Sequence, residues 1–243
     1  MSTAITETIA PGLPPVAVAT MRVPLRPQSA LPEHWTVADL QEHLGGVPLE
    51  RILLYPPPGF ATEEHVLDLD DHADRLCELE DGVLVEKPMG WYESLVASLI
   101  TTRLNVFLES HNLGKVLGAD GSLKILPGIV KIPDVSFISW SRWPKAKVPR
   151  RPIPALIPDL IVEVLSDTNV RREMMRKLVQ YFQADVRLVW YIDPVTQTAD
   201  VYTSPTLVTR VDVDGFLDGG DVLPGFRLSL RELFALADRQ PPT

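Results

Sequence analysis

One strand-helix-strand pattern constrains the fold of this chain more than any other feature. Leu160 to Leu165 is apolar on both faces except at Glu163, and such a run is typical of a central strand in a sheet. Apolar residues then recur every four positions between Thr168 and Ala184, which predicts a helix with one buried face. Leu188 to Ile192 returns as a second strand. The pattern therefore predicts a sheet whose central strands carry a packed helix.

The remaining patterns extend this sheet and add two more helices. Trp91 to His111 has apolar residues at intervals of three to four and predicts the longest helix. Asp81-Gly82 lies between two short strand-like runs and predicts a tight hairpin. Lys115 to Ser139 alternates with period two and predicts consecutive antiparallel strands, whereas Ser229 to Ala237 predicts a closing helix. The predicted fold class is therefore α/β (α+β), a mixed β-sheet flanked by α-helices in a single domain.

The chain divides into an N-terminal arm and one folded domain. Residues 1–32 contain six prolines and no sustained apolar period, so this segment is predicted to be a flexible arm. Residues 33–243 are predicted to form one domain, because a chain of 243 residues that is 45% hydrophobic can bury one core of ordinary size. The single cysteine, Cys77, excludes an intramolecular disulfide and a cysteine-based zinc cluster, so the fold depends on packing.

Charge and hydropathy narrow the possible partners. A net charge of −9 and a pI near 5.0 argue against a protein that coats nucleic acid nonspecifically, because phosphate binding relies on Lys and Arg. Five basic residues within 142–151 are an exception, and they form either solvated surface or a contact to a nucleic-acid backbone. No apolar run approaches the roughly 20 residues of a membrane span, so we expect no membrane partner and a cytoplasmic location.

Two acids form the core of the predicted site. An ionised Glu163 within an apolar strand would be costly to bury without a partner, which a metal ion, an arginine or water at the strand end could provide. Asp134 follows Pro133, which indicates that its strand either lies near an edge of the sheet or begins there. If that strand pairs beside Glu163, the two side chains stand about 5 Å apart and suit Mg²⁺ or Mn²⁺. Asp159 precedes Glu163 by four residues on one strand, roughly 13 Å away, which is too far to share an ion.

Lys177 is the third candidate residue. It borders the apolar face of the predicted helix, one turn before Tyr181 and one turn after Met174. Its ammonium group could therefore reach the sheet, orient or help deprotonate an attacking water, and neutralise charge that develops on a phosphate. The alternative interpretation is a surface lysine whose stem covers apolar residues.

Five motifs in this order point to a known family. They are Glu78-Leu-Glu-Asp-Gly82, Pro133-Asp134-Val135, Glu163-Val-Leu-Ser166, Lys177 with Tyr181, and Trp190-Tyr-Ile-Asp-Pro194. With these motifs the chain resembles the Uma-two family of bacterial endonucleases, which was long known only as a domain of unknown function. The resemblance runs from about Leu31 to the last helix, and it implies the restriction-endonuclease-like fold.

The resemblance also implies roles for individual residues. It implies that Asp134 and Glu163 are metal ligands, Lys177 is the catalytic lysine, and Glu78 is a further acid of the catalytic site. The chain departs from the pattern at two positions. In the wider superfamily the lysine usually lies two residues after the second acid, where this chain has Leu165, so Lys177 has to reach the site from its helix. The position after the first hairpin that often holds histidine is Glu93.

These residues lead to three hypotheses of function. The first is an endonuclease that depends on Mg²⁺ or Mn²⁺ and hydrolyses phosphodiester bonds in DNA. Nuclease folds that cut both strands often pair, so we also expect a homodimer. The second is a catalytically silent module that binds nucleic acid or another protein on the same fold, since a fold alone does not determine activity. The third is a structural homo-oligomer.

Overall fold

The structure is a computed structural model, and it describes residues 30–73, 75–88, 90–144 and 148–241. Most of the predicted arm, residues 1–29, lies outside the described residues, and so do Lys145 and Lys147 of the basic segment. The helices are α1 (Val37–His43), α2 (Glu63–Ala73), α3 (Trp91–His111), α4 (Arg171–Gln183) and α5 (Leu230–Ala237), with a 3₁₀ turn, η1, at Leu49–Arg51.

Three sheets contain the described strands. The five-stranded sheet has the order β1-β3-β2-β6-β5 and consists of β1 (Ile52–Leu53), β2 (Cys77–Glu80), β3 (Val83–Glu86), β5 (Leu123–Leu126) and β6 (Ile129–Lys131). The six-stranded sheet has the order β11-β10-β9-β8-β7-β4 and consists of β4 (Gly114–Leu117), β7 (Val135–Ser139), β8 (Leu160–Val164), β9 (Leu188–Asp193), β10 (Thr198–Ser204) and β11 (Leu207–Val211). A two-stranded ribbon joins β12 (Phe216–Asp218) and β13 (Arg227–Ser229).

The mixed sheet predicted from the sequence is the six-stranded one. Strand β8 is parallel to β9 and antiparallel to β7, and all five of its residues are buried, as expected for a central strand. The prediction of consecutive antiparallel strands over Lys115–Ser139 is wrong in one respect, because these strands belong to two different sheets. Strands β4 and β7 pair with each other, whereas the β5-β6 hairpin pairs with β2. The turn at residues 119–120 carries the chain from one sheet to the other.

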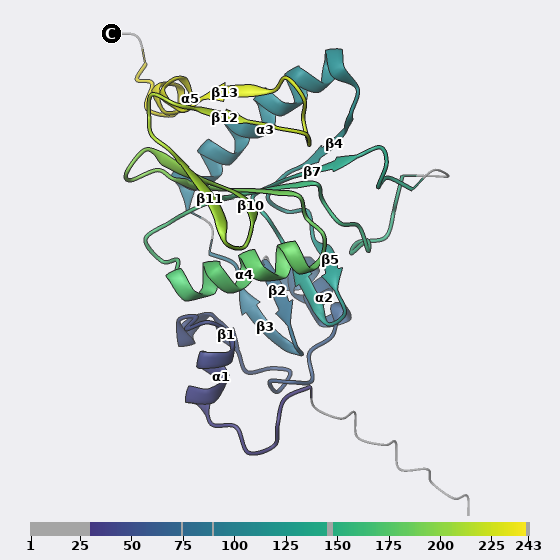
Figure 1. Ribbon diagram of the computed structural model, residues 1–243. Helices are drawn as coiled ribbons and strands as arrows, with labels where there is room; N and C mark the ends of the chain where they lie inside the picture. The colour runs from purple at the N-terminus through teal and green to yellow at the C-terminus, as the bar shows by residue number, and fades with distance from the viewer. Residues whose placement is uncertain (1–29, 74, 89, 145–147, 242–243) are drawn as a thin grey trace, which may run out of the picture.

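Helix α4 lies between the two larger sheets (Figure 1). Met174 and Leu178 of the predicted apolar stripe pack against the six-stranded sheet together with Tyr181, whereas Phe182 of that stripe is only partly buried. The polar residues Lys177 and Gln180 are also buried, because they face the five-stranded sheet and pair with charged residues there. The helix therefore has an apolar face and a charged face that are both covered by a sheet.

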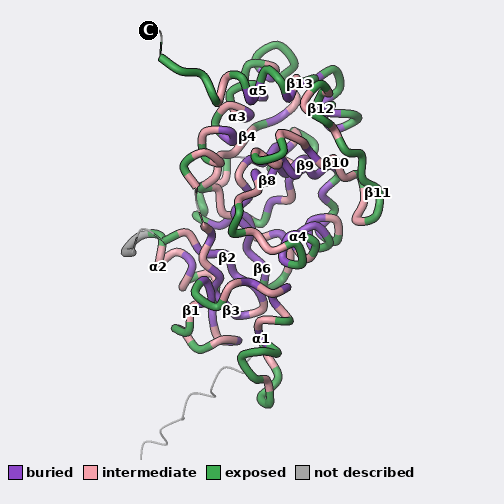
Figure 2. Tube along the Cα trace, turned by 90° about the vertical axis from the view of Figure 1, so that its left-hand side faces the viewer, coloured by how far each residue is buried: buried purple, intermediate pink, exposed green. Residues whose placement is uncertain are grey.

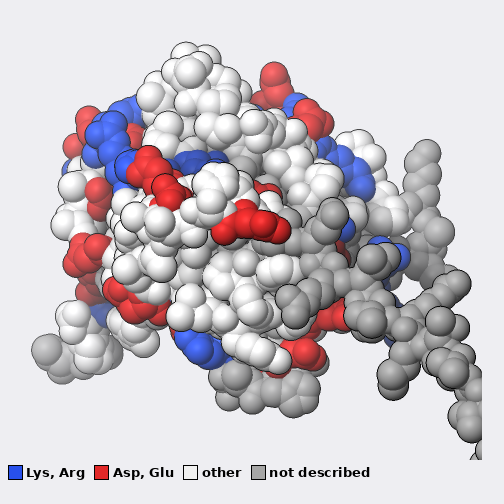
Figure 3. All heavy atoms as spheres, turned by 90° about the horizontal axis from the view of Figure 1, so that it is seen from below, with Lys and Arg blue, Asp and Glu red and all other residues white. Residues whose placement is uncertain are grey.

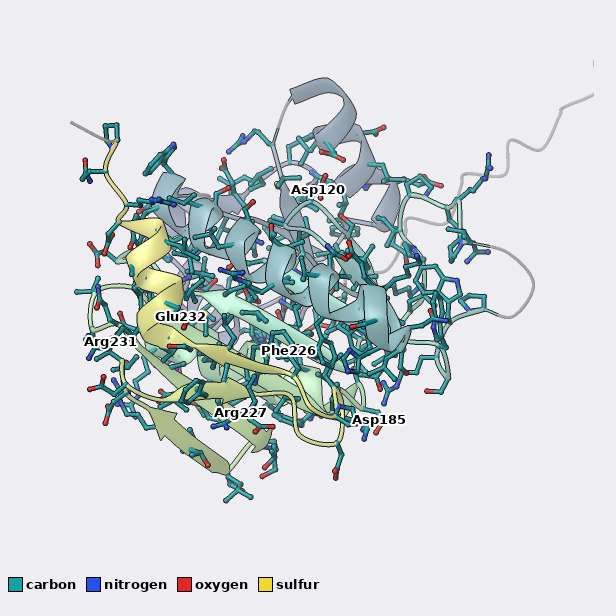
Figure 4. All side chains as sticks on the ribbon, turned by 90° about the horizontal axis from the view of Figure 1, so that it is seen from above. Asp120, Asp185, Phe226, Arg227, Arg231 and Glu232 are labelled. Carbon is teal, nitrogen blue, oxygen red and sulfur yellow. The ribbon has the colours of Figure 1, made fainter. Side chains whose placement is uncertain are left out.

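The opposite face of the six-stranded sheet is covered by α3, α5 and the β12-β13 ribbon, and this is the largest apolar core. Phe226 lies between this helical layer and the sheet (Figure 4), with its ring 5.3 Å from that of Phe107 and 6.1 Å from that of Trp190. Figure 2 shows β8 and β9 as buried strands surrounded by exposed loops. The central strands thus form a rigid base for the residues at their ends.

Local sequence signals explain several element boundaries. The Thr36 side chain accepts a hydrogen bond from the Asp39 backbone, and the Asp39 carboxylate accepts one from Thr36, so a capping box begins α1. Asp81 and Gly82 have φ angles of +48° and +77°, as a tight hairpin turn between β2 and β3 requires. Ser229 caps α5 by accepting a hydrogen bond from the Glu232 backbone.

The described surface carries no broad basic area on the face seen in Figure 3, where acidic and basic side chains are interspersed. This mixture agrees with the net charge of −9. No helix in the described part of the chain is long and apolar enough to cross a membrane.

Candidate active site

Asp134 and Glu163 lie side by side at one end of two neighbouring strands. Strands β7 and β8 pair in the register Val135↔Val162, so the next positions outward are the two acids. Because strand side chains alternate, Glu163 points to the same face as Ile161, which is the face that α4 covers. Both acids line one cavity of about 30 Å³, together with Lys177. This is the arrangement that the sequence predicts for the pair.

Both oxygens of the Asp134 carboxylate have a partner. Oδ2 accepts a hydrogen bond of 2.7 Å from the Val164 backbone N–H, which ties the start of β7 to the end of β8. Oδ1 lies 2.7 Å from the Lys87 ammonium group, which also donates a hydrogen bond to the Ile132 carbonyl. Lys87 is a buried residue of the site that the sequence did not reveal.

Glu163 is buried between a phenol and an ammonium group. The Tyr181 hydroxyl donates a hydrogen bond to Glu163 Oε1, and Lys177 Nζ lies 3.7 Å from the same oxygen. Burial raises the pKa of Glu163, Lys177 lowers it, and the Asp134 carboxylate raises it further, with a net upward shift. A cation next to the other oxygen of this carboxylate, Oε2, would favour the ionised form of Glu163.

Lys177 reaches the site from helix α4, as predicted from the sequence. Its ammonium group donates a hydrogen bond of 2.8 Å to Glu78 Oε1, in addition to its contact with Glu163. Burial lowers the pKa of Lys177, but Glu163 and Glu78 raise it by more, so its pKa lies above the ordinary value. Lys177 is therefore a fixed positive charge at neutral pH.

Glu78 lies behind Lys177 and does not line the cavity of the two acids. It borders a second cavity of about 20 Å³ between α4 and the five-stranded sheet. Its Oε2 lies 3.2 Å from Lys131 Nζ, and its Oε1 accepts a 3.3 Å hydrogen bond from the Ile132 N–H. Burial would raise the pKa of Glu78, but Lys131 and Lys177 hold it well below its usual range. This place favours a positioning role for Glu78 through Lys177.

Further buried charges continue this network away from the cavity. Lys131 and Arg176 both pair with Glu80, which also accepts a hydrogen bond from Gln180. The Arg51 guanidinium forms a two-pronged pair with Glu173 at 2.8 and 2.9 Å. The charged face of α4 is therefore neutralised residue by residue, which is what permits its burial.

Glu93 lines the same cavity as the two acids, from the first turn of α3. Its carboxylate folds over Gly90, where a β-carbon would lie only 1.7 Å from Glu93 Oε2. Glu93 forms no ion pair with any residue that the structure describes. This acid occupies the position that often holds histidine in similar sequences, so it is available for another partner.

Asp159 and Arg142 lie at the other end of β7 and β8. Asp159 is buried, accepts a 2.8 Å hydrogen bond from the Ser139 N–H and pairs with Arg142 at 3.0 Å. Arg142 also pairs with Asp185, which Figure 4 labels. These contacts give Asp159 and Arg142 structural partners, and neither residue lines the cavity of the two acids. Arg150 and Arg151 remain exposed and available for a nucleic-acid contact.

The donor groups at the cavity suit a hard divalent cation. Asp134 and Glu163 provide carboxylate oxygens, and Val164, whose N–H faces Asp134, lines the same cavity. Within the described ranges, no three acidic, histidine or cysteine side chains gather into a metal site. One or two carboxylates with additional water ligands are the usual protein contribution to a Mg²⁺ site, so the residues fit such an ion.

Comparison with known proteins identifies similar chains. The model of the Uma2 (Uma-two) family, described as "Putative restriction endonuclease", matches residues 63–231. A crystal structure of a putative nuclease of DUF820 from Anabaena variabilis ATCC 29413 superposes with a TM-score of 0.61 at 20% identity, over 68% of this chain and 93% of that chain. No curated protein matches the chain. The superposition confirms the predicted fold class.

Proposed function

The chain belongs to the Uma2 family, and from this premise we propose that it is a metal-dependent endonuclease that hydrolyses phosphodiester bonds in DNA. One observation carries the proposal: Asp134, Glu163 and Lys177, from two strands and a helix, line a single cavity. Two carboxylates with a cation beside them are suited to bind a divalent ion and a phosphate together.

Each residue has a defined part in this proposal. Asp134, Glu163 and the Val164 carbonyl would hold Mg²⁺ or Mn²⁺, which supplies Lewis-acid stabilisation of the phosphate and acidifies water when bound. Tyr181 holds one oxygen of Glu163 and so sets the direction of the other. The Lys177 ammonium group, 3.7 Å from Glu163 Oε1, would neutralise negative charge on the phosphate. Glu78 positions Lys177.

The test compares the cleavage of DNA by the wild type, Glu163→Gln and Lys177→Met in the presence of Mg²⁺ or Mn²⁺. We expect each substitution to lower the cleavage rate at least about a hundredfold, because Glu163→Gln removes a charge that holds the metal ion and Lys177→Met removes a positive charge that stabilises the transition state. Asp167→Asn is the control, since Asp167 is an exposed acid four residues after Glu163 that does not line the cavity. Equal cleavage by all four proteins would refute the proposal.

A silent binding module is the second candidate, and one observation favours it. Asp134 already has a counter-ion in Lys87, and Glu163 has Lys177, so the acids are neutralised without a metal ion. Titration with Mn²⁺ separates the two candidates. The endonuclease requires an ion whose binding is lost in both Asp134→Asn and Glu163→Gln, whereas the module requires none. The homodimer and the cytoplasmic location stay predictions.

A further inference from the structure

Lys87 is the cation that neutralises Asp134 in this structure. Asp134 Oδ2 accepts a hydrogen bond from the Val164 N–H, so Oδ1 is the oxygen that the backbone does not engage. The Lys87 ammonium group lies 2.7 Å from this Oδ1. An ammonium group and a divalent cation cannot share one carboxylate oxygen at close range without strong repulsion.

The cavity already holds cations next to its acids. Arg51, Lys87 and Lys177 line it with Glu93, Asp134 and Glu163, and of these cations Arg51 is paired with Glu173 and Lys177 also with Glu78. A divalent ion would add two positive charges beside Lys87 and Lys177.

The Lys87 side chain can leave without moving the backbone. The Lys87 N–H donates a 2.8 Å hydrogen bond to the Leu76 carbonyl, which fixes the chain at the end of β3. The Lys87 stem has four rotatable bonds, and the carboxylate of Glu93 lines the same cavity. Glu93 has no ion pair among the described residues, so it can receive the displaced ammonium group.

From this geometry we propose that Lys87 is a built-in counter-ion that competes with the metal, and that a divalent ion displaces its ammonium group from Asp134 toward Glu93. The inference rests on the proposed metal-dependent function and deepens it. Lys87 sets the metal affinity of the site and neutralises Asp134 until a metal ion binds.

The experiment measures Mn²⁺ affinity by calorimetric titration of the full chain without DNA. Lys87→Gln removes the charge but keeps a donor for the Ile132 carbonyl, and we expect it to bind Mn²⁺ at least about tenfold more tightly than the wild type. Lys87→Met is a second neutral variant in case the first does not fold, and urea unfolding monitors the fold. Lys87→Arg retains the charge and should bind no more tightly than the wild type.

Two further variants make the result specific. Lys124→Gln changes the net charge by the same amount at an exposed pair with Glu63, and it should leave the Mn²⁺ affinity unchanged. Glu93→Gln should weaken Mn²⁺ binding in the wild type, because the displaced ammonium group loses its partner. In the Lys87→Gln background the same substitution should have no effect, and this difference measures the coupling of Lys87 to Glu93.

The outcomes separate this inference from the function on which it rests. If the wild type and the neutral Lys87 variants bind Mn²⁺ equally, or the variants bind it more weakly, Lys87 does not compete with the metal. If Glu93→Gln weakens binding equally in both backgrounds, Glu93 is itself a ligand and does not receive Lys87. If neither the wild type nor Lys87→Gln binds Mn²⁺, the metal-dependent function fails and the inference fails with it.

Discussion

Substitution of Glu78 by Gln should destabilise the protein more than the loss of any exposed charge. The Glu78 side chain is 4% exposed and pairs with two buried ammonium groups, Lys177 at 2.8 Å and Lys131 at 3.2 Å. Glutamine keeps the shape of the side chain but removes its charge. In this variant Lys131 still has Glu80 as an ion-pair partner. Among the described residues, Lys177 keeps only the more distant partner Glu163.

The expected magnitude follows from the burial of both partners. Removing one member of a buried ion pair typically lowers the free energy of unfolding by about 3–5 kcal/mol, because the remaining charge lacks compensation. For a domain of this size, the corresponding fall in the melting temperature is roughly 6–20 °C. Chemical unfolding in urea measures the change, with an unaltered slope showing that the unfolding reaction stays the same.

Glu63→Gln provides the matched control. Glu63 pairs with Lys124, but the two side chains are 38% and 37% exposed, so solvent screens the pair. We expect a change below about 1 kcal/mol in this variant. Equal effects of Glu78→Gln and Glu63→Gln would refute the claim that buried charge pairs hold α4 to the five-stranded sheet.

The pH dependence of this stability difference has a defined sign. Burial would raise the pKa of Glu78, but the two lysines lower it below the ordinary value of 4.5. The unfolded chain therefore takes up the proton first as the pH falls, so the stabilisation by Glu78 begins to decrease near pH 4.5 and is lost progressively as the pH falls toward the lower folded-state pKa. The gap between the wild type and Glu78→Gln should be constant from pH 8 to about pH 5. A gap that closes within this range would contradict the assignment.

Three further outcomes are expected. Burial raises the pKa of Cys77 to about 11, so roughly one thiol in a thousand is ionised at pH 8 and thiol reagents should label only the unfolded chain. Gly82→Ala should lower the free energy of unfolding by about 1–3 kcal/mol or more, since its φ is +77° and a β-carbon would lie 2.6 Å from Gly59. Gly220→Ala, with open space around it, should lose about 1 kcal/mol. Phe226→Ala should lose about 3–5 kcal/mol in urea unfolding, because Phe226 is buried between two aromatic rings.

The two acids of the site could be found in the sequence, each on a different ground. An acid within an otherwise apolar central strand needs a partner, which drew attention to Glu163. Asp134 follows from strand geometry, since the antiparallel register places it opposite Glu163. Lys177 follows from helical periodicity, which brings it to the border of the buried face.

Lys87 and the division into two sheets could not be found in this way. Lys87 follows the end of β3, outside any periodic element, and it meets Asp134 only because the two sheets are brought together in space. The alternation of apolar and polar residues predicts a strand but not its pairing partner. The sequences of β5 and β6 therefore do not indicate that this hairpin pairs with β2. Tyr181 was within reach of sequence reasoning, because it lies one turn after Lys177 and its hydroxyl contacts Glu163.

The charged interface between α4 and the five-stranded sheet is best explained by the cavity beside it. Well-packed apolar residues would stabilise such an interface at least as well as buried ion pairs, which must offset the loss of hydration. Charged residues are needed, however, to hold the ammonium group of Lys177 at 3.7 Å from Glu163, because a lysine in an apolar interior would lose its proton. Glu163 and Glu78 together keep that proton on Lys177, and Lys131 in turn compensates Glu78. The need for one cation at the cavity therefore explains the successive buried ion pairs that run from Lys177 to Glu78 and on to Lys131 in the core.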